Sequence, residues 1–122
     1  MFHAEANKAG AGLLTMSFAQ HVNAREMSRC LARVIDLLEG LQPGFQLMTD
    51  LSSLELMDAN CVPDLRAMME LCNRKGVKTV LRVIPHPEKD IGFTLLSHFH
   101  YGPNVVVQTY ESLADAMQGY SA

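Results

Sequence analysis

Residues 45–84 read FQLMTDLSSLELMDANCVPDLRAMMELCNRKGVKTVLRVI, and their hydrophobic pattern changes twice. The apolar run at 44–51 is short and follows a proline, which is typical of a strand buried on both faces. Residues 61–75 have the period of a helix, whose inward face is formed by Leu65, Met68, Met69 and Cys72. Gly76 can end this helix. Residues 77–84 are rich in β-branched side chains and predict a second strand. This order of elements predicts a βαβ unit with parallel strands and a right-handed crossover.

The residues before this unit predict a hairpin and a longer helix. The run LLTMSF at 13–18 is typical of a strand, and a weaker alternating run before it can pair with it through a turn at NKAG. Residues 23–39 predict a helix, because apolar side chains recur with helical spacing at Met27, Cys30, Leu31, Val34, Ile35 and Leu38. Asn23 with Glu26 resembles a capping box, and Gly40 can end the helix.

The residues after the unit predict two more helices and a last strand. Residues 87–100 begin with a proline and predict a third helix with a weak apolar face. Residues 104–109 predict a strand, and residues 111–119 predict a short terminal helix. Together the elements predict an α/β fold with a mixed, mostly parallel sheet, an N-terminal hairpin and about four helices. With no linker or repeat in the chain, we expect a single domain over residues 1–122.

The composition fits a compact protein and argues against two classes of partner. The chain has 122 residues, of which 48% are hydrophobic and 19% charged, and its formal net charge is -3. No cluster of Lys or Arg interrupts this balance, so we expect no nucleic-acid partner. No apolar stretch approaches the roughly 20 residues needed to span a bilayer, and the N-terminus lacks a signal-peptide pattern, so we expect no membrane span. Three widely spaced cysteines predict reduced thiols in a cytoplasmic protein.

The segment LMDANCVPDL at 56–65 joins the first strand of the unit to its helix. Its simplest interpretation is a helix cap, in which Asp58 or Asn60 accepts a bond from an unpaired backbone N–H and Pro63 lies in the first turn. A second interpretation is a helix N-terminus presented to a protein partner or an anion. A helix N-terminus can lower the pKa of a thiol such as Cys61, but no base stands next to it in the sequence, so we expect no nucleophile.

Residues 45–84 resemble the central part of a STAS domain, the module of sulphate transporters and anti-sigma-factor antagonists. That family has a strand ending in Asp-Leu-Ser, a short connector, a serine-bearing loop, a helix and a basic-glycine turn into the next strand. Here DLS at 50–52 matches the strand end, MD at 57–58 matches the start of the loop, and RKG at 74–76 matches the turn. The resemblance implies a STAS-like fold.

The loop departs from the family pattern at its phosphate acceptor. In bacterial regulators of this family, a partner kinase phosphorylates the serine directly after the loop aspartate, and the matching residue here is Ala59. Phosphorylation would add about two negative charges. Ala59 has no hydroxyl to which a phosphate could be attached. Asn60 replaces the second serine, and Cys61 and Pro63 stand where glycines are common. The resemblance therefore implies a regulatory module that binds a protein partner, an anti-sigma-type kinase or another regulator, without a switch at this residue.

Two groups of candidate site residues follow from these patterns. The expected partner-binding loop, with the start of its helix, consists of Asp58, Ala59, Asn60, Cys61, Asp64 and Arg66. The expected strand-end group consists of Asp50, Ser52 and Ser53, because open α/β sheets bind ligands beyond the carboxyl ends of their strands. A turn stabilised by side-chain bonds is the alternative interpretation of that group. We predict no catalytic residues, metal site or cofactor, because the histidines lack ligand spacing and no P-loop, GxGxxG or GxSxG motif occurs.

An alternative function is the binding of a small apolar ligand such as a lipid. The helix expected at 87–100 has Pro87 at its start and Gly92 at its centre, so it could lift from the sheet above a pocket. A homodimer formed through Phe99 and Tyr101 is a third alternative.

Overall fold

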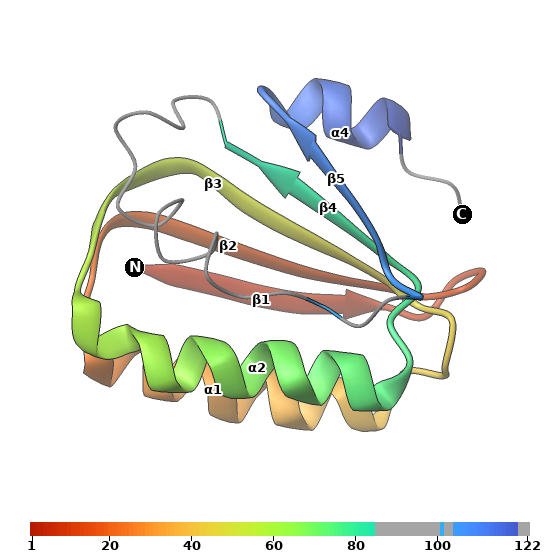
Figure 1. Cartoon of the computed structure of the whole chain (residues 1–122), viewed down its shortest axis with the longest axis horizontal. Coiled ribbons are helices and arrows are strands. Elements are labelled where there is room, and N and C mark those ends of the chain that lie inside the picture. The colour runs from red at the N-terminus through yellow and green to blue at the C-terminus, as the bar shows by residue number, and fades with distance from the viewer. Residues whose placement is uncertain (85–100, 102–103, 120–122) are drawn as a thin grey trace.

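A five-stranded sheet forms the middle layer of the protein (Figure 1). The computed structural model describes residues 1–84, 101 and 104–119. The elements in chain order are β1 (Phe2–Asn7), β2 (Leu13–Val22), α1 (Ala24–Glu39), β3 (Gln46–Met57), the 3-10 turn η1 (Ala59–Cys61), α2 (Val62–Lys75), β4 (Thr79–Val83), β5 (Val106–Tyr110) and α4 (Leu113–Gly119). The strands lie in the order β1-β2-β3-β4-β5; β1 is antiparallel to β2, and the other neighbouring pairs are parallel. The predicted α/β fold with a mixed, mostly parallel sheet is confirmed.

The N-terminal hairpin is also confirmed. β1 pairs with β2 from Phe2 opposite Phe18 onward along the whole of the first strand. The turn between the two strands contains two glycines with positive φ, Gly10 at 60° and Gly12 at 92°. Glycine adopts this backbone conformation without the steric cost that other residues meet, so the turn chemistry of the sequence agrees with the fold.

The helix α1 begins at its predicted cap. The side-chain oxygen Oδ1 of Asn23 accepts a hydrogen bond of 2.9 Å from the backbone N–H of Glu26. The buried side chains of α1 are Met27, Cys30, Val34 and Leu38. Ile35 corrects the predicted inward face, because its side chain is 43% exposed. It lies on the flank of α1 that looks toward α2 rather than toward the sheet.

The helix α2 ends at Gly76, as predicted. The φ angle of Gly76 is 99°, in the left-handed region, and its N–H donates to the carbonyls of Cys72 and Asn73. A Cβ at this position would lie only 2.9 Å from the Cβ of Pro43. The glycine is therefore required twice, by the backbone conformation and by the loop that passes close to it.

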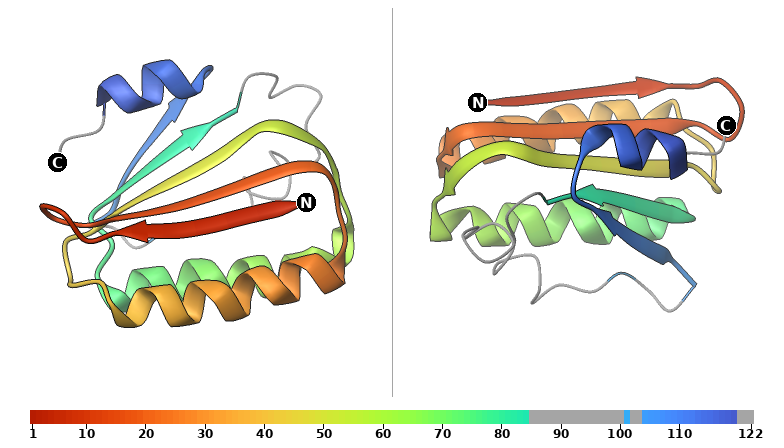
Figure 2. Two further views of the ribbon diagram at one scale, coloured as in Figure 1. Left: turned by 180° about the vertical axis from the view of Figure 1, so that it is seen from behind. Right: turned by 90° about the horizontal axis from the view of Figure 1, so that it is seen from above.

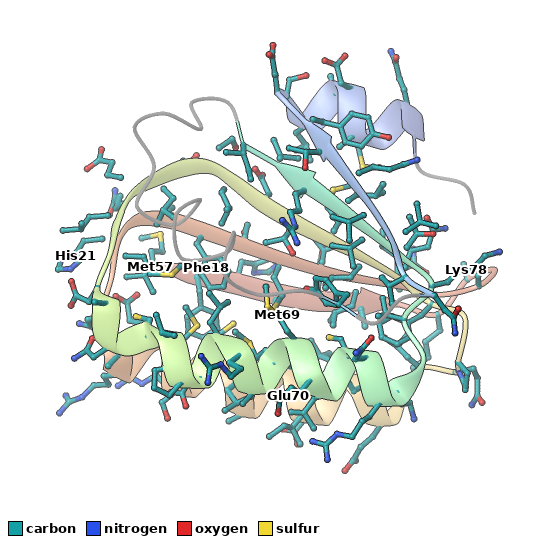
Figure 3. The ribbon with its side chains drawn as sticks, in the orientation of Figure 1. Phe18, His21, Met57, Met69, Glu70 and Lys78 are labelled. Atoms are coloured by element: carbon teal, nitrogen blue, oxygen red, sulfur yellow. The ribbon has the colours of Figure 1, made fainter. Side chains whose placement is uncertain are left out.

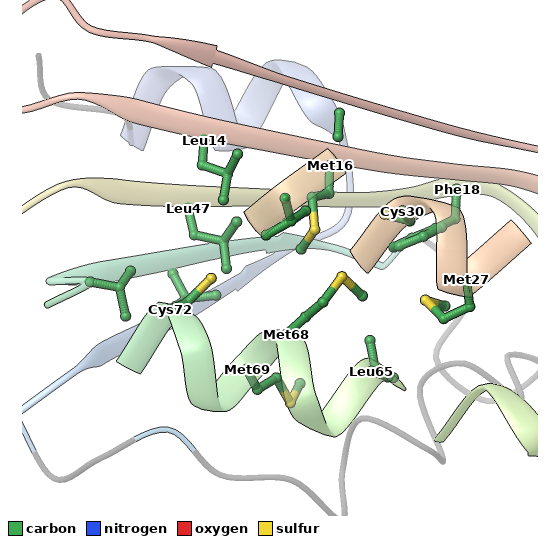
Figure 4. Close-up of a cluster of buried hydrophobic side chains, with 14 of the residues drawn as sticks. Leu14, Met16, Phe18, Met27, Cys30, Leu47, Leu65, Met68, Met69 and Cys72 are labelled. Atoms are coloured by element: carbon green, nitrogen blue, oxygen red, sulfur yellow. The ribbon is translucent and has the colours of Figure 1, made fainter. Parts of the chain in front are cut away.

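The main hydrophobic core lies between the sheet and the two long helices. α1 and α2 lie side by side on one face of the sheet, and their inward side chains interleave with those of β2 and β3 (Figures 1 and 4). The core side chains labelled in Figure 4 are Leu14, Met16, Phe18, Met27, Cys30, Leu47, Leu65, Met68, Met69 and Cys72. On the opposite face, α4 covers a smaller cluster formed by Met48, Leu81, Val83 and Ala116 (Figure 2).

β2 and β3 are both longer than the sequence predicted. β2 runs to Val22 rather than to residue 18, and β3 runs to Met57 rather than to residue 51. The two strands remain paired to their ends, with two shifts of register on the way. β4 ends opposite Asp50, so among the described strands the second half of β3 pairs with β2 alone. Most residues of that half are exposed or half-buried, which gives it the sequence pattern of a connector.

The third predicted helix, at 87–100, lies outside the described residues, as do Gly92 and Phe99. The last predicted strand and the terminal helix are confirmed as β5 and α4. No helix in the described part of the chain has the length and apolar character needed to cross a membrane.

Candidate functional site

The predicted partner-binding loop lies where β2 and β3 end together. The backbone N–H of Asp58 donates to the carbonyl of Val22 at 3.0 Å, and the N–H of Cys61 donates to the carbonyl of Asp58 at 3.0 Å. The Cys61 thiol donates to the same Val22 carbonyl at 3.6 Å. These bonds hold η1 against the end of the sheet, and α2 begins directly after it.

Asp58 does not cap a helix, which corrects the simplest interpretation of the sequence. It precedes η1, but its side chain makes no capping bond. Its Oδ1 lies instead 2.6 Å from Nε2 of His21, near the end of β2. Figure 3 shows His21 at the same end of the molecule as Met57, the last residue of β3. The carboxylate thus joins two strand ends rather than satisfying its own helix.

His21 is a site residue that the sequence did not reveal. Parallel pairing places it opposite Leu56, which brings its ring close to the loop that follows β3. The apolar run of the sequence predicts a strand that ends at residue 18, which leaves His21 outside the sheet. A prediction that extended this strand to Val22, in parallel register with β3, would have placed His21 near the loop.

The loop side chains differ in their exposure. Ala59, Asn60 and Arg66 are exposed, Asp58 and Asp64 are half-buried, and Cys61 is buried. The structure therefore brings five of the six predicted residues to the surface around the start of α2. Asp64 and Arg66 are two residues apart on the helix, so they point to different flanks of it, about 200° from each other.

The three cysteines are free, buried thiols. Burial raises the pKa of Cys61, and the nearby carboxylate of Asp58 raises it further. This direction is opposite to the lowering that a helix N-terminus alone would cause. Burial also raises the pKa values of Cys30 and Cys72 to about 12. All three are therefore protonated core side chains at neutral pH, with little nucleophilic character.

The strand-end group is not at the end of its strand. Asp50, Ser52 and Ser53 lie within β3, which continues to Met57. Oδ1 of Asp50 accepts a hydrogen bond of 2.9 Å from the N–H of Ser52, so its side chain stabilises the local backbone. Ser52 and Ser53 are exposed. Eight residues separate Asp50 from Asp58, roughly 26 Å of extended chain, so the structure does not bring the two predicted groups together.

A small cavity lies between α2 and the sheet. Its lining side chains are Met16, Thr49, Leu65, Met68, Met69, Cys72, Arg82 and Tyr101. Its volume of about 10 Å³ is enough for about one water molecule. The guanidinium of Arg82 lies over the ring of Tyr101 at 5.9 Å from the ring centroid. Burial lowers the pKa of Arg82 and raises that of Tyr101, so both groups share an apolar environment.

Tyr101, one of the two residues of the homodimer alternative, is partly buried and packs against the main core cluster. Phe99, the other residue of that alternative, lies outside the described residues. Within the described part of the chain, no group of three or more His, Cys, Asp or Glu side chains is placed to hold a metal ion.

Sequence comparison found no relatives for this chain: no family model matches it, and no curated protein does. Comparison of structures did find neighbours. An uncharacterised DUF3478-family protein with a SpoIIAA-like fold from Shewanella loihica PV-4 superposes with a TM-score of 0.72 at 12% identity, over 97% of this chain and 92% of that one.

Two further solved structures are also similar to this chain. The Bacillus cell fate determinant SpoIIAA in its phosphorylated form gives a TM-score of 0.62 at 12% identity, over 96% of this chain and 98% of that one. An anti-sigma factor antagonist from Mycobacterium paratuberculosis gives 0.59 at 18% identity, over 98% and 93%. Each of these superpositions covers at least 92% of both chains. The chain therefore has a SpoIIAA-like fold.

Proposed function

We propose that the protein is a non-catalytic regulatory module of the cytoplasm that binds a protein partner through the η1 surface. We define this surface as Asp58, Ala59, Asn60, Asp64 and Arg66. Two of the neighbours in structure are named anti-sigma factor antagonists, whose name describes action on another protein. The three unpaired, buried cysteines agree with a reducing compartment.

The observation that carries this proposal is the fixed geometry of η1. Two backbone hydrogen bonds of 3.0 Å and the contact of 2.6 Å between His21 and Asp58 hold the turn in one position. The side chains of Ala59 and Asn60 are nevertheless exposed at its tip. A rigid, exposed turn loses little conformational entropy when a partner covers it, which favours binding.

Regulation of this contact is proposed to differ from that of a phosphorylated relative. SpoIIAA has been solved in phosphorylated and unphosphorylated forms. By the resemblance of the loops, the corresponding residue here is Ala59, which has no hydroxyl. The carboxylates of Asp58 and Asp64 lie close enough to Cys61 to raise its pKa. With these two anions and one cation, Arg66, the η1 surface carries net negative charge without modification. We propose that binding through the η1 surface is constitutive, in that phosphorylation at residue 59 does not control it.

A matched pair of substitutions tests the proposal. Ala59→Arg adds a long, charged side chain at the tip of η1, whereas Ala11→Arg makes the same change at an exposed turn residue between β1 and β2. Affinity capture from an extract of the cells that make the protein identifies the partner of the unchanged chain. Purified partner is then titrated against both variants by calorimetry.

We expect Ala59→Arg to weaken binding at least tenfold, and Ala11→Arg to bind as the unchanged chain does. Equal binding by both variants would show that η1 is not the contact. Because both alanines are exposed, circular dichroism is expected to show two folded proteins.

The carriage of a small apolar ligand is the second candidate. The place predicted for its pocket, under the helix expected at 87–100, lies outside the described residues. The cavity under α2 is a different place, and it is lined by methionines such as Met16, Met68 and Met69, whose side chains adapt readily to the shape of a guest. At about 10 Å³ the cavity must widen before it admits more than a water molecule. Native mass spectrometry of the purified protein tests this candidate directly: a carrier retains an added lipid-sized mass, and a mass equal to that of the chain alone counts against it.

A further inference from the structure

A second surface feature lies between the outer sides of α1 and α2, at their C-terminal ends. It is an open groove of about 290 Å³ lined by Ile35, Leu38, Glu39, Leu71, Arg74 and Lys75, and we call it the helix groove. The groove faces away from the sheet. It also lies at the opposite end of α2 from η1, so it is distinct from the η1 surface.

The floor and rim of the helix groove are apolar. Leu38 and Leu71 are largely covered, but the side chain of Ile35 is 43% exposed. Contact with a second surface would remove the carbons of this branched apolar side chain from water, which is favourable. The neighbouring residues on the same flank of α1, Ser28 and Ala32, are small and exposed, so another helix can approach closely.

The two walls of the helix groove carry opposite charges. The wall from α1 carries Glu39, and the wall from α2 carries Arg74 and Lys75. Within the described residues these three side chains form no ion pair with one another or with other groups. A surface with an acidic wall, an apolar floor and a basic wall is complementary to a second copy of itself.

The directions of the helices determine how two copies would fit. α1 and α2 both connect parallel strands across the same face of the sheet, so they run in the same direction (Figures 1 and 2). A twofold axis along the groove, parallel to both helices, lays α1 of one copy over α2 of the second at the same level. Glu39 then faces Arg74 and Lys75 of the second copy, and Ile35 faces Leu71. Twofold symmetry forms each of these contacts twice.

We propose that the helix groove is the contact of a homodimer, in which α1 of each copy packs on α2 of the other. This inference does not depend on the proposed function. Where both hold, the dimer presents two η1 surfaces at one end, because the axis runs parallel to α2. A partner with two binding sites would bind such a dimer with higher overall affinity than a monomer.

Charge reversal across the groove gives a sharp test. One variant is Glu39→Arg, which places positive charge on both walls. The other is Arg74→Glu with Lys75→Glu, which places negative charge on both walls. In a homodimer of either variant, like charges meet twice. In a mixed dimer of the two variants, each arginine or lysine meets a glutamate.

Sedimentation velocity over about a hundredfold range of concentration is the measurement. We expect the unchanged chain to dimerise and each variant alone to dimerise at least tenfold more weakly. An equimolar mixture of the two variants is expected to recover the dimer, and native mass spectrometry is expected to find one copy of each in it. As a control, Arg25→Glu and Glu111→Arg reverse exposed charges outside the groove and should leave dimerisation unchanged.

Three outcomes would overturn the proposal. They are an unchanged chain that stays monomeric over the whole range, variants that dimerise as well as it does, and a mixture that recovers no mixed dimer. A different helical partner in the groove corresponds to the first outcome. Ile35→Asp provides an independent check, because the exposed position of Ile35 lets the chain fold while a charge enters the apolar part of the contact. We expect this variant to dimerise at least tenfold more weakly, and unchanged dimerisation would count against the proposal.

Discussion

The ring nitrogen Nε2 of His21 lies 2.6 Å from Oδ1 of Asp58 and joins the end of β2 to the residue after β3. The two residues are 37 positions apart in the chain. Both side chains are partly exposed, at 56% and 36%, so water weakens the electrostatic part of the contact. Its main effect is geometric, because it determines where η1 begins.

We predict a small but measurable coupling between these two side chains. His21→Ala, Asp58→Ala and the double variant form a cycle, and an exposed pair of this kind contributes up to about 1 kcal/mol to the free energy of unfolding. Urea denaturation gives the coupling energy. His3→Ala is the control, since the contact of His3 with Glu5 is longer, at 3.5 Å, and both groups are more exposed. Effects of His21→Ala and Asp58→Ala that simply add would mean that the pair does not stabilise the loop.

Two glycines with nearly the same backbone conformation predict different costs for the same substitution. Gly44 and Gly76 have φ angles of 97° and 99°. An added Cβ meets no atom within 4 Å at Gly44, but lies 2.9 Å from Pro43 at Gly76. Gly44→Ala should therefore cost about 1–2 kcal/mol from backbone strain alone, and Gly76→Ala should cost more. Thermal unfolding of both variants checks this order. Equal losses of stability would show that the contact with Pro43 adds no cost at Gly76.

Two apolar residues three positions apart on α1 predict very different losses of stability on truncation. Leu38 is 6% exposed and Ile35 is 43% exposed, although both belong to the apolar pattern of the sequence. Leu38→Ala should lower the free energy of unfolding by about 2–5 kcal/mol, because it leaves a cavity in the core. Ile35→Ala should lower it by less than about 1 kcal/mol. Urea denaturation at low protein concentration, where a dimer would dissociate, measures both free energies of unfolding. A larger loss for Ile35→Ala than for Leu38→Ala would show that Ile35, not Leu38, faces the core.

The buried cysteines predict a loss of stability at alkaline pH. Burial raises the pKa values of Cys30 and Cys72 from 9.0 to about 12 in the folded chain. Between these values the unfolded chain loses thiol protons that the folded chain keeps, so the free energy of unfolding falls as pH rises above about 9. The urea midpoint should therefore decrease from about pH 8 to about pH 11.

A Cys30→Ala variant is the control for this titration, because it removes one of the buried thiols. It should lose stability at every pH through its cavity, but its decrease between the two pH values should be smaller. A decrease of the same size in both proteins would assign the alkaline effect to other groups. Labelling with a thiol reagent should be slow in the folded chain at neutral pH and rapid in urea.

Local patterns in the sequence predicted the elements of this fold. The spacing of Met27, Cys30, Val34 and Leu38 predicted α1, the residue Asn23 predicted its start, and Gly76 predicted the end of α2. Each of these signals acts over a few residues, through helical period, a capping bond or a left-handed backbone. Such interactions need no distant partner, so they can be identified before the tertiary structure is known.

The tertiary structure decided the features that carry the proposals. The Asp58 side chain was expected to cap its own helix, but the register of β2 on β3 placed His21 within reach, and the contact between strands formed instead. Ile35 fits the apolar period of α1, yet the sheet covers only the far side of the helix and leaves that flank open toward α2. Register and helix placement arise from contacts between residues tens of positions apart. The hydrophobic period fixes which elements form, while these distant contacts fix which of their side chains meet and which stay exposed.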